Sequence, residues 1–321
     1  MDFDVLAEIA ATRGLDLRDD NVQILLTKTV REAGKNNRFA GGSLPLTPRW
    51  PVVMDALREP VEFKALASVL NRHYPPDHEL LVLTTEDYPP EGGDDIRVRD
   101  VAHLGADVLV AVIPSLPILD AHRDPRTLQH IVARLRASDG CPWDRKQTTQ
   151  SLRNALIDEV YEALDAIDAG DMDNLAEELG DLGLLIMMHA QIAEEAGHFT
   201  LEDVYEGITA KVIRRHPHVF GDDSNHDDLD VVGLWKRVKA EEKAAGKLSS
   251  TEKAADGQPR SMPALTRAAR VLQKHPLTPD QPAPAGPGGE MLAVIAGIIA
   301  AGDDPDAVLR DALNQYVSES D

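Results

Sequence analysis

Two short acidic clusters supply the side chains of this sequence that are best suited to hold a metal ion. The first is Asp158-Glu159-Val160-Tyr161-Glu162, and the second is Glu177-Glu178-Leu179-Gly180-Asp181. Each cluster places two carboxylates three residues apart, Glu159 with Glu162 and Glu178 with Asp181, which puts each pair on one face of a helix. Carboxylate oxygens are hard ligands that favour Mg²⁺ or Mn²⁺. A divalent metal site is therefore one interpretation of these two clusters.

Two consecutive helices, predicted near residues 149–169 and 173–196, must position these carboxylates. Each helix carries an apolar stripe with its carboxylate pair along one edge, so antiparallel packing would bring all four acids to one half-buried rim. The alternative is that the clusters are solvated helix faces, or that the second one complements a helix dipole. The matched arrangement on neighbouring helices favours the metal site but leaves the alternative open.

Basic side chains follow the acidic helices in an otherwise acidic chain. Lys211, Arg214 and Arg215 lie at one predicted helix end, and Trp235 and Lys239 lie on the next predicted helix, residues 229–245. Arginine forks match phosphate oxygens in a bidentate manner. Taken alone, the cations could simply stabilise a helix C-terminus. Together with a metal site, they indicate a site for the polyphosphate of a nucleotide.

The composition limits the class of protein and its partners. Hydrophobic residues make up 43% of the chain but aromatic residues only 4%, which suits a core of packed helices. The net charge of −22 argues against nucleic acid and anionic membranes as partners. Cys141 is the single cysteine, so an internal disulfide is excluded and a reducing, cytoplasmic location is expected. The longest apolar run, 291–301, is too short to span a bilayer.

The remaining pattern predicts a mixed N-terminal part and helices elsewhere. Residues 1–118 resemble a small α/β domain, with a helix at 63–73 and buried strands at 79–84 and 107–114. Further helices are predicted at 127–138 and 201–214, and shorter ones at 290–301 and 305–317. The segment 247–289 is linker-like, and its Pro- and Gly-rich stretch 281–289 is expected to be disordered or extended.

Several motifs occur in a fixed order across the helical region. They are Gly140-Cys141-Pro142-Trp143-Asp144, Gln147-Thr148, Ser151-Leu152, Asp158-Glu159-x-x-Glu162, Glu178-Leu179-Gly180-Asp181 and Lys211-x-x-Arg214-Arg215-His216-Pro217-His218-Val219-Phe220. In this order and spacing they resemble the MazG family of nucleoside triphosphate pyrophosphohydrolases, over roughly residues 120–245. One departure is Asp158, where the family usually has Glu; this position is not assigned as a ligand.

The resemblance implies an all-α bundle that hydrolyses NTPs or dNTPs, including non-canonical or oxidised ones, to the monophosphate and pyrophosphate with Mg²⁺, or alternatively Mn²⁺. Carried over to this sequence, the catalytic metal ligands are Glu159, Glu162, Glu178 and Asp181, and the substrate contacts are Lys211, Arg214, Arg215, Trp235 and Lys239. The family also forms dimers, so a homodimer or higher homo-oligomer is expected. The implied role is house-cleaning of the nucleotide pool.

The flanking segments resemble parts of larger members of that family. The expected organisation is a methylase-like remnant without an evident active site at 1–118, the MazG domain at 119–246, a linker at 247–289 and a degenerate helical repeat at 290–321. That repeat lacks the acidic quartet, so no second metal site is expected there.

Two other functions compete with pyrophosphate hydrolysis. A di-iron oxidase is disfavoured because such sites use Glu-x-x-His on two helices, where this sequence has Glu178-x-x-Asp181 and Glu159-x-x-Glu162. The other alternative is a non-catalytic, stress-regulatory protein that senses nucleotides. The sequence leaves open the preferred base and sugar, the carboxylate that acts as a base, and the role of residues 1–118.

Overall fold

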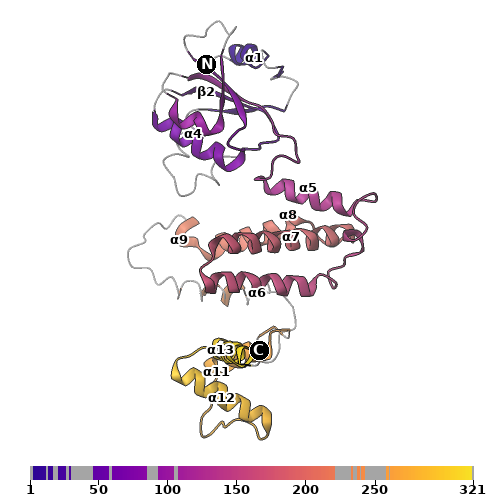
Figure 1. Cartoon of the computed structure of the whole chain (residues 1–321), viewed down its shortest axis with the longest axis vertical. Helices are drawn as coiled ribbons and strands as arrows, with labels where there is room; N and C mark the ends of the chain where they lie inside the picture. The colour runs from indigo at the N-terminus through magenta and orange to yellow at the C-terminus, as the bar shows by residue number, and fades with distance from the viewer. Residues whose placement is uncertain are drawn as a thin grey trace. The chain divides into compact units, whose positions relative to one another are not determined.

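The chain combines a small α/β part with packed helices. The computed structural model describes residues 3–11, 14–16, 21–26, 29, 46–57, 60–84, 93–104, 108–220, 233, 237–238, 240–242, 258–259 and 261–319. They divide into two compact units, Met1–Ala210 and Lys211–Asp321. The predicted mainly helical fold with an N-terminal sheet is confirmed (Figure 1), whereas the predicted domain limits stay predictions. No helix within these ranges has the length and apolar character needed to cross a bilayer.

A five-stranded mixed sheet organises the N-terminal part of the first unit. Its strand order is β1-β2-β5-β3-β4, in which β1 and β2 are parallel and the other neighbours are antiparallel. The strands are β1 (Gln23–Leu25), β2 (Val52–Leu57), β3 (Glu79–Thr84), β4 (Asp94–Arg97) and β5 (Val108–Ile113). The two predicted strands are β3 and β5. Strand β2 was missed because its short apolar run begins directly after Pro51, where a turn-rich stretch of sequence ends.

Both faces of this sheet are buried, because successive strand side chains point to opposite sides. One face packs on α4 (Pro60–His73), where Met54, Leu80 and Ile113 meet a core that includes Phe63 and Leu70. The other face packs on α1 (Phe3–Ala11), where its residues form a second core with Ile9 and Ala10. A short 3-10 helix, η2 (Val98–His103), contacts α4. Continuous apolar strands such as β5 are typical of a sheet covered on both sides.

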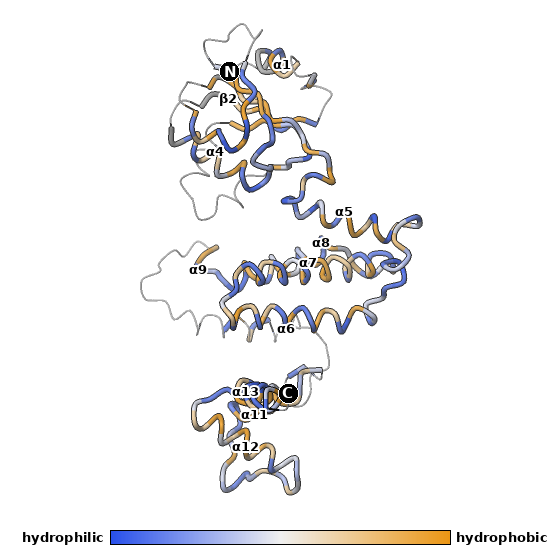
Figure 2. Tube along the Cα trace, in the orientation of Figure 1, coloured by the Kyte–Doolittle hydropathy of each residue, from blue (hydrophilic) through white to orange (hydrophobic). Residues whose placement is uncertain are grey.

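Three helices of the first unit, with the start of a fourth, surround a separate apolar core. They are α5 (Pro125–Arg136), α6 (Arg153–Ala169), α7 (Met172–Glu195) and α8 (Leu201–Arg215). This core contains Val132 from α5, Leu185 and Met188 from α7, and Leu201 from α8. Figure 2 shows the hydrophobic and hydrophilic positions that alternate along α6 and α7, as amphipathic helices require.

Helix α6 begins later than the sequence predicts. Its N-cap residue is Leu152, and no side chain accepts a capping hydrogen bond there. Instead, Ser151 Oγ accepts from the Thr148 amide at 2.9 Å and Thr148 Oγ1 accepts from the Ser151 amide at 3.0 Å. This reciprocal bonding stabilises a turn ahead of the helix, since hydroxyl side chains can satisfy nearby backbone groups in place of helical bonds.

The C-terminal part of the second unit is more helical than predicted. Among the described residues that follow α8, the helices are α9 (Pro217–Phe220), α11 (Ala264–Lys274), α12 (Pro287–Ala301) and α13 (Pro305–Ser318). Helix α11 lies inside the segment expected to be a linker, and α12 begins within the stretch expected to be disordered or extended. The reason is packing, because Ala269 and Leu272 of α11 share a core with Ile295 of α12. The predicted helix 229–245 lies mostly outside the described residues.

Candidate metal centre

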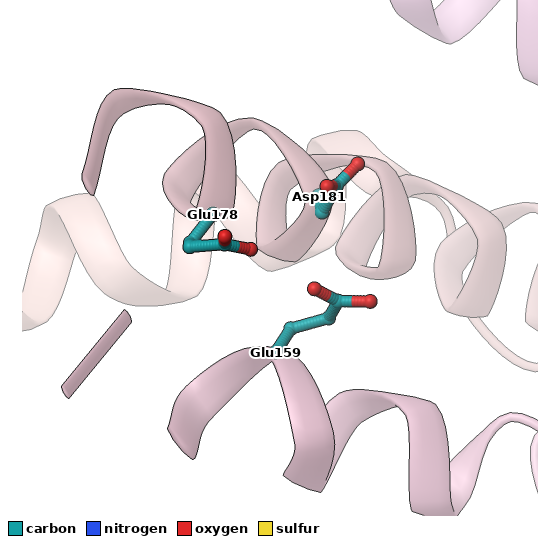
Figure 3. A group of neighbouring side chains, drawn as sticks. All are labelled: Glu159, Glu178 and Asp181. Carbon is teal, nitrogen blue, oxygen red and sulfur yellow. The ribbon is translucent and has the colours of Figure 1, made fainter. Parts of the chain in front are cut away.

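Three carboxylates from two helices converge at one point of the first unit. Glu159 comes from α6, and Glu178 and Asp181 come from α7. One oxygen from each residue lies within 4.8 Å of the corresponding oxygens of the other two. Figure 3 shows the Glu159 side chain extending from its helix toward the two acids of α7. The structure therefore brings together three of the four predicted ligands.

A tight helical hairpin produces this convergence. Gly170 ends α6 in the left-handed conformation, with φ of 69°, where glycine avoids the steric cost of a Cβ. Asp171 then caps α7 by accepting a hydrogen bond from the Asn174 amide at 3.0 Å. The chain thus reverses within two residues, so α6 and α7 pack antiparallel along their length (Figure 1). Residues three apart on α7 then share the face that meets α6.

A buried arginine holds the loop before α6 against the far end of α7. The Arg136 side chain is 6% exposed, and its Nε and Nη2 donate to Glu195 at 2.9 and 2.7 Å. Its Nη1 donates to the Asp144 carbonyl oxygen at 2.5 Å and to the Gln147 carbonyl oxygen at 3.2 Å. This guanidinium joins the last turn of α5 both to the loop that precedes α6 and to the end of α7. It therefore fixes where α6 begins relative to α7. The sequence alone gave no signal for this role.

The electrostatics of the three carboxylates are unfavourable without a cation. Glu178 is buried, with 7% of its surface exposed, and Glu159 and Asp181 are half-buried. Desolvation by burial, followed by the charges of Glu162 and Glu159, raises the pKa of Glu178. Desolvation also raises the pKa of Glu159, and the charges of Glu162 and Asp181 raise it further. A side-chain hydrogen bond with Glu178 partly lowers this pKa. A divalent ion would remove this repulsion, and three close carboxylates are the donor set that Mg²⁺ or Mn²⁺ accepts.

Glu162, the fourth predicted ligand, does not belong to the group of three. It lies exposed on α6, three residues after Glu159. Its charge nevertheless raises the pKa of both Glu159 and Glu178, so its carboxylate lies within electrostatic reach of the site. Its role as a ligand therefore stays a prediction.

The predicted cationic contacts occur in the second unit and have an unexpected partner. Arg214 and Arg215, the last two residues of α8, both donate hydrogen bonds to the carboxylate of Glu242. Lys211 is half-buried on the same helix, while Trp235 and Lys239 lie outside the described residues. Glu242 was not identified from the sequence. The pattern around this residue shows only one adjacent acid and a preceding run of basic residues, which does not indicate a partner for the arginines.

Comparison with known proteins finds a family match that covers the converging carboxylates. The family model described as "MazG nucleotide pyrophosphohydrolase domain" matches residues 147–220, which include all three converging carboxylates. A nucleoside triphosphate pyrophosphohydrolase of Escherichia coli K12 is 41% identical over 45% of this chain and 54% of that protein. The "Nucleoside triphosphate pyrophosphohydrolase/pyrophosphatase MazG" of Thermotoga maritima is 48% identical over 38% of this chain and 46% of that protein.

A third relative extends the similarity beyond the matched domain. The "Uncharacterized protein YabN" of Bacillus subtilis is 40% identical over 62% of this chain and 40% of that protein. This chain therefore spans about half, or less, of the length of the three relatives.

Proposed function

The chain belongs to the MazG family of nucleotide pyrophosphohydrolases, and from this premise we propose that it hydrolyses nucleoside triphosphates to monophosphates and pyrophosphate. The observation that carries the proposal is the convergence of Glu159, Glu178 and Asp181 within the matched domain. Mg²⁺, with Mn²⁺ as the alternative, is the proposed ion, held by these three carboxylates and by Glu162. Such an ion supplies charge neutralisation at phosphate groups and activation of water.

The protein side chains have separable roles in this reaction. Glu178 is the most buried of the three acids, so it fixes the position of the site on α7. Glu159 is half-buried and its pKa is raised, which suits a carboxylate that orients a water molecule or accepts its proton. Lys211, Arg214, Arg215, Trp235 and Lys239 are the proposed substrate contacts, of which the cations would neutralise charge on the leaving pyrophosphate.

The test is a panel of canonical and oxidised nucleoside triphosphates incubated with the purified full chain. With Mg²⁺ we expect monophosphate and pyrophosphate in equal amounts, and with EDTA we expect neither. Faster release of pyrophosphate from oxidised substrates would support a house-cleaning role. The proposed location is the cytoplasm, which the single cysteine, Cys141, favours. Nucleotide binding without any pyrophosphate release would contradict the proposal and indicate a nucleotide-sensing protein instead.

A homodimer formed through the helical part belongs to the same proposal. An unusual number of large apolar side chains is exposed along its helices. They are Ile157, Val160, Tyr161, Leu164 and Ile167 on α6, Leu179 and Ile186 on α7, and Val204, Tyr205 and Ile208 on α8. Exposed apolar side chains that recur at helical spacing, as they do on α6, are typical of an interaction site, and closed twofold symmetry is the commonest way to cover one.

Leu164→Asp is expected to separate the two copies. Leu164 is 42% exposed, and an aspartate at this position would place an unpaired charge in an apolar interface. We expect the dissociation constant of the dimer to rise roughly a hundredfold. Sedimentation velocity would show half the wild-type mass, whereas Asn154→Asp, which adds the same charge at an exposed position of the first turn of α6, should leave the mass unchanged. A Leu164→Asp protein that keeps the wild-type mass would contradict this interface.

A further inference from the structure

A single carboxylate of the second unit binds two arginines that were expected to bind phosphate. Arg214 donates from Nε and Nη2 to Glu242 Oε1, at 2.9 and 2.5 Å. Arg215 donates from Nε at 3.1 Å and from Nη2 at 2.6 Å to Glu242 Oε2. Each oxygen of Glu242 therefore serves mainly one guanidinium, and the two guanidiniums are locked in one mutual orientation.

The carboxylate is more deeply buried than either arginine. The Glu242 side chain is 4% exposed, while that of Arg214 is 38% exposed and that of Arg215 is 20% exposed. A ligand from solvent would thus meet the arginines before the carboxylate. Hydrogen bonds from Arg215 and Arg214 lower the pKa of Glu242 to about 2, so the carboxylate is charged at neutral pH. Two positive charges and one negative charge leave the cluster with a net positive charge, which still attracts phosphate.

We propose that Glu242 is a positioning residue that holds the Arg214 and Arg215 guanidiniums ready for the phosphate chain of the substrate. The inference rests on the proposed function, because it assigns the two arginines to polyphosphate binding. Nη1 of Arg214 takes no part in its bonds to Glu242. Fixing a guanidinium in advance reduces the rotamer entropy that is lost on binding, and a charged carboxylate fixes it more firmly than a neutral group.

Two other roles for Glu242 make different predictions. If the carboxylate occupied the position that a phosphate takes, it would compete with the substrate, and its removal would strengthen polyphosphate binding. If it only tied its own segment to α8, across the 28 residues that separate it from Arg214, its removal would lower stability without a specific effect on polyphosphate affinity. The low exposure of Glu242 argues against competition, since displacement would leave a charged group buried without its partners.

Glu242→Gln tests these roles because it keeps the shape of the side chain and removes its charge. The probe is inorganic tripolyphosphate, titrated calorimetrically into the full-length protein in EDTA, so that neither metal nor turnover is needed. We expect Glu242→Gln to weaken tripolyphosphate binding on the order of tenfold. In the Mg²⁺ assay, KM for a nucleoside triphosphate should rise by a similar factor while kcat changes less. Glu242→Asp, which keeps the charge on a shorter arm, should restore part of the affinity.

Glu241→Gln is the matched control. Glu241 is the exposed neighbour of Glu242, so the variant changes net charge by the same amount at an adjacent position. We expect its tripolyphosphate affinity and KM to stay near the wild-type values. Circular dichroism and thermal melting of every variant show whether the fold persists; if Glu242→Gln does not fold, the comparison passes to Glu242→Asp.

The proposal is overturned if the folded variant at Glu242 binds tripolyphosphate as tightly as the wild type, or more tightly. It is also overturned if the wild-type protein binds no tripolyphosphate, even if pyrophosphate release then confirms the proposed function. Conversely, a wild type that binds tripolyphosphate through this cluster but releases no pyrophosphate would contradict the proposed function and leave the positioning role supported.

Discussion

Asp181→Asn is expected to lower the rate of pyrophosphate release by on the order of a thousandfold, because it removes a charged ligand from the group of three carboxylates. The same substitution should make the metal-free protein more stable to heat. The negative charge of Asp181 raises the pKa of both Glu159 and Glu178, so its removal relieves repulsion that the metal-free fold tolerates. Opposite effects on activity and stability distinguish a metal ligand from a residue that merely supports the fold.

The measurements are single-turnover pyrophosphate release with Mg²⁺ and thermal melting in EDTA. Glu177→Gln is the matched control for turnover, because Glu177 is an exposed acid of α7 outside the group of three whose charge also raises the pKa of Glu178. It changes the net charge equally, and we expect wild-type turnover within about threefold. An Asp181→Asn protein that turns over at the wild-type rate would show that the converging carboxylates do not carry the chemistry.

The sequence was sufficient to predict those parts of the site that local helix geometry determines. The spacing of Glu178 and Asp181 defines one face of α7, and the two-residue turn at Gly170 and Asp171 makes α6 its antiparallel neighbour. These two facts bring Glu159 into place. The same spacing rule applied to Glu162 was less informative, because periodicity fixes the helix face but not the burial of each side chain. Glu162 lies exposed, outside the group of three.

Contacts between distant segments were beyond the reach of sequence reasoning. Glu242 meets Arg214 and Arg215 across 28 and 27 residues, and no local periodicity predicts such a pair. Helix α11 illustrates the same difficulty within the segment expected to be a linker. Arg267, Arg270 and Lys274 interrupt its apolar residues, yet its buried face packs on α12. Tertiary packing, rather than intrinsic preference, stabilises a helix of this length.

We expect the removal of divalent ions to reverse the pH dependence of the contribution that this site makes to the stability of the fold. The pKa values of Glu159 and Glu178 are raised in the folded protein above their ordinary value of 4.5. Between the unfolded and folded pKa values, the folded state therefore binds more protons than the unfolded state. The contribution of these groups to the stability of the metal-free protein is consequently favourable at low pH and is lost as pH rises through the folded pKa values.

Added Mg²⁺ should restore that loss, so its stabilising effect should grow with pH. We expect a larger Mg²⁺-induced rise in melting temperature at about pH 8 than at about pH 5, because ligand binding requires deprotonated carboxylates. At a free ion concentration of about a hundred times Kd, the gain is about 2.7 kcal/mol. Glu177→Gln should keep this pH-dependent gain and Asp181→Asn should lose most of it. Equal gains in the two variants would mean that the ion binds elsewhere. Of the two substituted residues, Asp181 belongs to the group of three and Glu177 does not.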